Sequence, residues 1–195
     1  MSSHKLVEII DLEIARNKAI IEIGSSRPTD SFESSTRYFF EISKAIGANF
    51  YSVDVSEKSF ETARDICGEC AVQQDGSKFL IDRSKEFEEN IAILYLDNFD
   101  IVYNDKHKSS LLTRADGVYG PNGEHLNNER SAEVHLAQVI AALPNLTNEG
   151  VIIFDDTQLR DGDWWGKGAT GVPYLLGLGF RVIDSHDDGC ILQRP

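Results

Sequence analysis

Two apolar runs decide the fold of this 195-residue chain: Ile91-Ala92-Ile93-Leu94-Tyr95-Leu96, followed by Asp97, and Gly150-Val151-Ile152-Ile153-Phe154, followed by Asp155 and Asp156. Continuous apolar runs bounded by polar residues are typical of strands buried on both faces, as in parallel α/β sheets. Such sheets bind ligands outside the carboxyl ends of their strands. We therefore expect the three acids to converge on one crevice.

Helical and extended patterns alternate on either side of these runs. Strands are predicted at 19–23, 49–53 and 71–74 before the first run, and at 180–183 and 190–192 after the second. Helical patterns occupy 5–16, 35–46, 56–68, 77–87, 129–143 and 173–178. This succession predicts an α/β fold, a Rossmann-like, doubly wound, mostly parallel sheet of seven strands with helices on both faces.

Two irregular segments interrupt the alternation. Residues 100–128 hold three glycines and a proline without a sustained pattern, and we expect them to form a lid-like insertion in a single domain spanning 1–195. Residues 158–168 form a second, Gly-rich loop that carries Trp164 and Trp165. Adjacent tryptophans either pack on the domain or form a wall of a substrate pocket. Their position just after Asp156 favours the pocket.

Composition excludes several partner classes. The formal net charge of -13 opposes binding to nucleic acid or anionic lipid, because both are bound mainly through clustered Lys and Arg. No apolar stretch is long enough to span a bilayer, and the amino terminus lacks the apolar core of a signal peptide, so we expect a cytoplasmic protein. Cys67 and Cys70 have C-x-x-C spacing near a helix end, where inert thiols are expected rather than redox or metal ligands.

Polar residues follow each of the first three strands. Gly24 would let the backbone approach a ligand at the first turn, although an ordinary tight turn has the same sequence. Asp54 follows the second strand, where an acid commonly accepts hydrogen bonds from a ribose diol. Asp75 follows the third and would accept from the exocyclic amine of adenine. Helix capping is the alternative for both acids. The missing G-x-G-x-x-G pattern counts against a nicotinamide or flavin dinucleotide.

In combination, Glu22-x-Gly24, Asp54, Asp75 and Asp97 resemble the class I S-adenosylmethionine-dependent methyltransferases over nearly the whole chain. The resemblance implies that the last strand of the sheet is antiparallel. The family's glycine-rich first loop is replaced here by Ser25-Ser26 after Gly24. The resemblance also implies the residues around S-adenosylmethionine, namely Glu22, Gly24, Ser25, Asp54, Asp75, Gly76, Ser77 and Asp97.

Asp97 with the pair Asp155 and Asp156 is similar to the divalent-metal motif of small-molecule O-methyltransferases of the catechol and macrolide-sugar types. That likeness implies Mg²⁺ at these three acids. Hard cations favour carboxylate oxygens while keeping several waters, and a bound cation lowers the pKa of a coordinated hydroxyl. Helix capping, or binding of the cofactor's amino group, is the alternative role of the acids.

The general base is less clearly marked. Metal-dependent relatives often place a Lys or His three residues after the strand-four acid, and here that residue is Asp100, so Asp97 and Asp100 are the catalytic candidates. Lys106, His107 and His125 in the insertion are alternatives, each of which is also an ordinary loop residue. Tyr95 is expected in the strand core and His135 on a helix surface.

These features predict O-methylation of a small-molecule hydroxyl, such as that of a sugar or phenol, by S-adenosylmethionine with assistance from Mg²⁺. A non-catalytic module that binds S-adenosylmethionine or a nucleotide, acting as a sensor or assembly partner, is the alternative. A nucleotide-sugar or nicotinamide-dependent oxidoreductase has the same fold class but needs the missing pyrophosphate loop. A homo-oligomer is compatible with either function.

Overall fold

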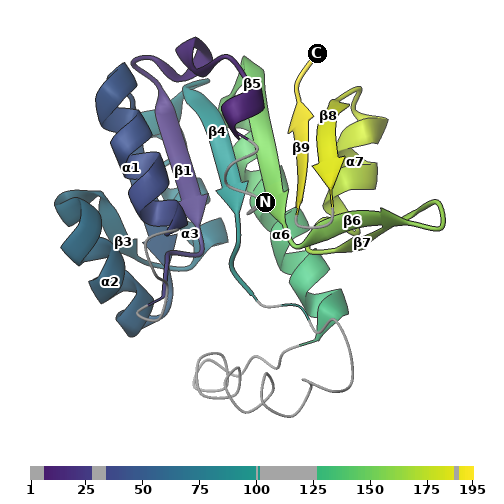
Figure 1. Ribbon diagram of the computed structural model, residues 1–195, viewed down its shortest axis with the longest axis horizontal. Coiled ribbons are helices and arrows are strands. Elements are labelled where there is room, and N and C mark those ends of the chain that lie inside the picture. The colour runs from purple at the N-terminus through teal and green to yellow at the C-terminus, as the bar shows by residue number, and fades with distance from the viewer. Residues whose placement is uncertain (1–6, 28–33, 100, 102–126, 187–188) are drawn as a thin grey trace.

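A seven-stranded sheet with the order β3-β2-β1-β4-β5-β9-β8 forms the centre of the molecule, in a computed structural model that describes residues 7–27, 34–99, 101, 127–186 and 189–195 (Figure 1). Strands β1 to β5 pair in parallel, whereas β9 is antiparallel to both β5 and β8. The predicted Rossmann-like sheet, with its antiparallel last strand, is confirmed. The strands are β1 Ala19–Ile23, β2 Asn49–Asp54, β3 Ala71–Gln73, β4 Ile91–Leu96, β5 Leu146–Asp155, β8 Arg181–His186 and β9 Gly189–Gln193.

Helices cover both faces of the sheet because the central strands are apolar on both sides. One core cluster joins Ile20 and Ile93 to α1 (Ser35–Ile46) and α2 (Glu57–Cys67). The other joins Ile21 and Leu94 to the helices of the opposite face. Figure 1 shows α1 in front of the sheet and α6 behind it. The helices of the second face are α3 Gly76–Asp82, α4 Ser84–Phe87, α6 Asn128–Ala142 and α7 Gly171–Gly177.

Side-chain caps set where these helices begin. Ser34, Ser56, Asp75 and Asn127 each accept a hydrogen bond from the backbone N–H three residues ahead. Each such cap stabilises its helix by about 1 kcal/mol. Among the described residues, none of the helices has the length and apolar character that crossing a bilayer requires.

Three expectations about local structure were wrong. The predicted helix at 5–16 is, in its described part, a pair of 3₁₀ turns that include Leu12–Ala15, because the Asp11 carboxylate accepts from Glu13 N–H and starts a new turn. The predicted helix at 77–87 divides at Arg83 into α3 and α4. The loop at 158–168 is mostly a hairpin, β6 Thr157–Arg160 with β7 Asp163–Gly166. The expected lid at 100–128 lies almost entirely outside the described residues.

The hairpin has a physical basis that the loop prediction overlooked. Asp161 and Gly162 both have positive φ, at 51° and 93°, as in the two-residue turns that match the twist of paired strands. At its far end Gly166 has φ of 95°, and a Cβ there would lie 1.8 Å from the carbonyl oxygen of Asp156. The hairpin therefore brings the chain back into contact with the end of β5. Only glycine at position 166 permits so close an approach.

Gly166→Ala and Gly162→Ala separate close packing from backbone strain. Both positions have positive φ, but a Cβ at 162 meets nothing within 4 Å. We expect Gly162→Ala to cost about 1 kcal/mol of unfolding free energy and Gly166→Ala about 3 kcal/mol or more, because overpacking adds to the strain. Urea unfolding of both variants measures the difference. Equal losses would show that the hairpin does not press on β5.

Candidate functional site

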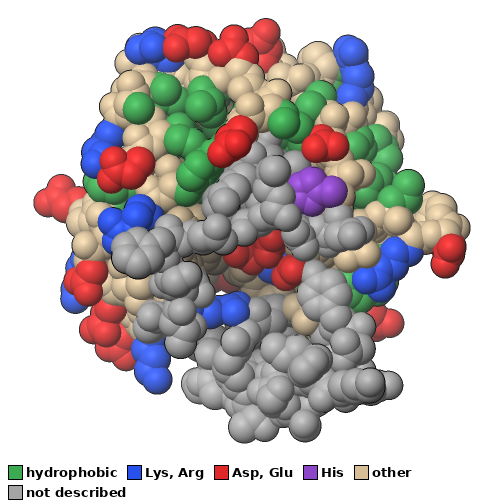
Figure 2. All heavy atoms as spheres, in the orientation of Figure 1, with side chains coloured by type: hydrophobic (Ala, Val, Ile, Leu, Met, Phe, Trp, Pro, Cys, Tyr) green, Lys and Arg blue, Asp and Glu red, His purple; other side chains and the backbone are tan. Residues whose placement is uncertain are grey.

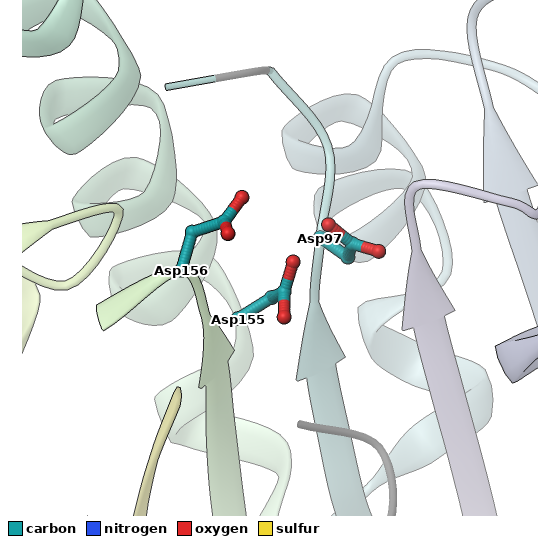
Figure 3. Close-up of side chains that lie close together, drawn as sticks. All are labelled: Asp97, Asp155 and Asp156. Atoms are coloured by element: carbon teal, nitrogen blue, oxygen red, sulfur yellow. The ribbon is translucent and has the colours of Figure 1, made fainter. Parts of the chain in front are cut away.

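Three carboxylates converge where β4 and β5 end. Asp97 directly follows β4, Asp155 is the last residue of β5, and Asp156 comes next with a positive φ of 47°. The register pairs Leu96 with Phe154, which places the acids side by side, and one oxygen from each lies within 4.8 Å of the others (Figure 3). In the space-filling view, acidic side chains lie recessed near the centre of the face (Figure 2). The expected convergence is confirmed.

The ammonium of Lys167 lies among these carboxylates. Its Nζ is 2.5 Å from Asp97 Oδ1, 2.9 Å from Asp156 Oδ2 and 3.2 Å from Asp155 Oδ2. The lysine side chain is 1% exposed, whereas those of Asp97, Asp156 and Asp155 are 30%, 28% and 18% exposed. Burial alone lowers the pKa of Lys167, but the charges of Asp156, Asp97 and Asp155 outweigh it and raise the pKa well above its usual value.

The acids fit a hard divalent cation in their chemistry, since three carboxylates offer oxygen ligands from two adjoining strand ends. The position that such a cation would share among them, however, holds the Lys167 ammonium. A divalent ion and the lysine therefore compete for the same oxygens. Mg²⁺ at Asp97, Asp155 and Asp156 stays a prediction, and an ion that used the oxygens paired with Lys167 would have to displace its ammonium.

Sequence reasoning missed Lys167. The lysine lies in Trp165-Gly166-Lys167-Gly168, within the segment interpreted as an irregular loop. Its N–H donates to the Asp156 carbonyl at 3.2 Å, and Gly168 N–H donates to Thr157 Oγ1 at 2.8 Å, so the chain is held on both sides of it. The signal available in the sequence was the lysine between two glycines shortly after an acid pair.

His135 is buried, not on the helix surface as predicted. It lies on the same side of α6 as Ser131 and Gln138, at spacings of four and three residues, and all three are 0% exposed. Burial lowers the pKa of His135 to about 3, and the charge of Lys167 adds to the effect. Within the described part of the chain, His135 Nε2 and both polar atoms of the Gln138 amide have no hydrogen-bond partner. Polar groups therefore line the buried side of α6.

Glu22 lies beneath the turn that follows β1. It is 0% exposed; its Oε1 accepts from Ser35 Oγ at 2.5 Å, and its Oε2 accepts from Ser52 Oγ at 2.6 Å and Thr36 Oγ1 at 2.7 Å. Burial raises the pKa of Glu22 to about 7, although the three hydroxyls oppose the rise. The carboxylate is enclosed, so it supports the turn and α1 instead of facing a ligand directly.

Serines hold the turn itself. Ser25 N–H donates to Asp54 Oδ2 at 3.0 Å, and Ser26 N–H donates to Thr36 Oγ1 at 2.9 Å. Gly24 has φ of 99°, and a Cβ there would lie 2.3 Å from the Asn98 nitrogen, so the turn packs directly on the chain that leaves β4. The serine side chains also bind protein groups, since Ser25 Oγ lies 2.7 Å from Ser52 Oγ and Ser26 Oγ lies 2.7 Å from Ser34 Oγ.

The other predicted cofactor residues lie at the same edge of the sheet. Asp54 Oδ1 also accepts from Ser56 N–H at 2.7 Å, and exposed Asp75 accepts from Lys78 N–H at 2.9 Å as the cap of α3. Gly76 and Ser77 open that helix. Capping is therefore observed, and contacts of these residues with a cofactor stay predictions. Asp100, Lys106, His107 and His125 lie outside the described residues.

The tryptophans and cysteines have local partners. Trp164 packs against the core, and the guanidinium of Arg160 lies 3.9 Å from the centre of the Trp165 ring. A pocket wall formed by these rings stays a prediction. Cys67 and Cys70 are free thiols, and burial raises the pKa of Cys67 to about 12, which agrees with an inert role.

Solved structures that match this fold include several methyltransferases. CalS11, a TDP-rhamnose 3'-O-methyltransferase of calicheamicin biosynthesis, matches with a TM-score of 0.56 at 14% identity, over 98% of this chain and 76% of its own. The 1,6-didemethyltoxoflavin-N1-methyltransferase of Burkholderia thailandensis, solved with S-adenosylhomocysteine, matches with a TM-score of 0.54 at 13% identity. The match covers 98% of this chain and 76% of that one. The mycinamycin-pathway methyltransferase MycE, in complex with Mg and SAH, matches with a TM-score of 0.53 at 10% identity. The match covers 92% of this chain and 46% of that one.

The sequence itself matches no protein-family model and no curated protein. At identities of 10–14%, the structural matches establish the fold. The class I methyltransferase fold that the motifs implied is thereby confirmed.

Glu22 makes stability depend on pH. Its pKa is about 7 in the folded chain against an ordinary 4.5, so the folded state binds the proton more tightly. The contribution of Glu22 to the free energy of unfolding is fully present below pH 4.5. It falls by as much as about 3 kcal/mol as the pH rises through about 7. We expect Glu22→Gln to flatten this part of the curve of unfolding free energy against pH. Parallel curves for variant and wild type, from urea unfolding at pH 4.5 to 8, would contradict this assignment.

Proposed function

We propose that this chain is an S-adenosylmethionine-dependent methyltransferase that transfers the methyl group to a hydroxyl of a small molecule. The observation that carries the proposal is the meeting of the Gly24 turn, Asp54 and Asp97 at the carboxyl ends of β1, β2 and β4. In sheets of this type that edge is where ligands bind. The likeness of fold to methyltransferases of small molecules supports the same activity.

The cofactor is placed along this edge by the acids that end the strands. Asp54 accepts one backbone N–H on each oxygen, and a carboxylate oxygen can accept a second hydrogen bond, here proposed from the ribose hydroxyls. Asp75 is exposed beyond it, at the distance of the next strand, for the adenine amine. Asp97, two strands away from Asp54, would bind the positively charged methionine end. Glu22 acts indirectly, by holding the turn between them.

The acceptor hydroxyl would lie over Asp97, Asp155 and Asp156, whose side chains are partly exposed. Its oxygen attacks the methyl carbon, the carbon–sulfur bond breaks with its electron pair going to sulfur, and the hydroxyl proton passes to a carboxylate. Alignment of the two reactants supplies most of the acceleration in such an in-line transfer. Asp100 stays the alternative proton acceptor.

The acid motif implies a more specific version of the proposal, in which Mg²⁺ assists the methyl transfer. Bound Mg²⁺ would favour ionisation of the acceptor hydroxyl. The acid triplet and the magnesium complex of MycE support this form, and the position of Lys167 among the acids opposes it. A nitrogen acceptor is the other variant, since one structure of the same fold is an N1-methyltransferase. The cytoplasmic location and the absence of nucleic-acid and membrane partners remain predictions from composition.

Cofactor binding is tested with S-adenosylhomocysteine and S-adenosylmethionine by calorimetry. We expect both to bind, and Asp54→Ala to weaken binding by about 1.5–3 kcal/mol because a charge-assisted bond to the ribose is lost. Asp65→Ala, which removes an exposed acid from α2, is the control and should leave affinity unchanged.

Because Asp54 also holds two backbone N–H groups, urea unfolding must show that Asp54→Ala is folded at the temperature of the titration. No heat with either ligand at millimolar concentration would refute cofactor binding. Binding without transfer of a labelled methyl group to any compound in a panel of sugars, phenols and amines would favour the non-catalytic binding module.

A further inference from the structure

We infer that Lys167 is the resident cation of the acidic cluster and takes the place of a divalent metal. The inference concerns which cation the three acids hold, and only its consequence for catalysis rests on the proposed function. The lysine ammonium touches one oxygen of each acid, at 2.5–3.2 Å, from a side chain that is 1% exposed. That central position is the one that a shared metal ion would need.

The backbone around Lys167 opposes its departure. Gly166 is pressed against the Asp156 carbonyl, Lys167 N–H donates to that same carbonyl, and Gly168 N–H donates to Thr157. The side chain also donates to the Asp97 carbonyl at 3.3 Å. These contacts hold the backbone of Lys167 against the end of β5, and its side chain is 1% exposed, so the ammonium is enclosed among the acids and is not that of a surface lysine.

Charge favours the same conclusion. Without the lysine, three carboxylates at the ends of adjoining strands would repel one another at short range. The ammonium offsets one of the three negative charges and leaves a net negative site. A divalent ion that entered beside the ammonium would be repelled by it at close range. Occupation by lysine and by metal are thus mutually exclusive.

Lys167 acts in this proposal as a positioning residue. It pairs with one oxygen each of Asp97, Asp155 and Asp156, and so fixes how these side chains, which are 18–30% exposed, lie toward a cofactor or acceptor. The lysine itself is too deeply buried to contact the acceptor. If the proposed function holds, methyl transfer proceeds without divalent metal and is unaffected by EDTA.

The test is titration with Mn²⁺ alone, followed by the electron paramagnetic resonance of free Mn²⁺, so that the readout is independent of cofactor and turnover. We expect wild type to show no saturable site up to millimolar Mn²⁺. Lys167→Ala should gain one Mn²⁺ site whose dissociation constant is at least tenfold below the highest Mn²⁺ concentration at which wild type shows no saturation. Adding Asp156→Asn to Lys167→Ala should abolish that site. Lys78→Ala removes an exposed lysine paired with Asp82 and should behave as wild type.

Saturable Mn²⁺ binding to wild type that is as tight as in Lys167→Ala and is lost in Asp156→Asn would overturn the inference. So would absence of binding in both wild type and Lys167→Ala, because the lysine would then not stand in a metal's position. Lys167→Gln replaces Lys167→Ala if the latter does not fold, and tight wild-type binding refutes the inference without either variant. Calorimetry with S-adenosylhomocysteine on the same samples reports separately on the proposed function.

Discussion

Taking the Lys167 ammonium out of water requires compensating charge beside it, and the fold supplies three carboxylates from two adjoining strand ends. Removal of one partner from such a buried ion cluster typically costs about 3–5 kcal/mol, because the remaining charge is left without compensation. The parallel pairing of β4 with β5 brings the acids together, and the hairpin held against Asp156 brings Lys167 to them. The geometry of the acids, and hence what they can bind, depends on the lysine between them.

A second polar network, around Glu22, holds the cofactor side of the edge. Its three hydroxyl donors come from α1 and β2, and Ser25 and Ser26 extend the network into the turn. In many proteins of this fold class a glycine-rich turn lets the backbone approach the ligand. Here Gly24 is followed by two serines, whose hydroxyls lie 2.7 Å from those of Ser52 and Ser34 and help to fix the turn. The two networks meet where Gly24 packs on the residues that follow β4.

The proposed function rests on both the likeness of fold to methyltransferases and the acidic cluster, and the two observations differ on which cation the acids hold. One structure of the same fold is a complex with magnesium, whereas this chain places an ammonium among its acids. Because carboxylates can hold either cation, the acid motif alone does not distinguish them. The distinction lies in a residue that is 11 positions beyond Asp156 and reaches it only through the hairpin.

The sequence by itself determined the seven-stranded sheet, most of its helices and the convergence of Asp97 with Asp155 and Asp156, because apolar runs on both faces and parallel strand ends depend on local pattern and chain order. It did not determine which polar side chains are buried or which charges pair with one another. The enclosure of Glu22 by hydroxyls was not predicted, His135 was expected at the surface and is buried, and Lys167 was not identified. Burial and ion pairing arise from contacts between segments distant along the chain, so only the tertiary structure decided which charges face a ligand and which neutralise one another.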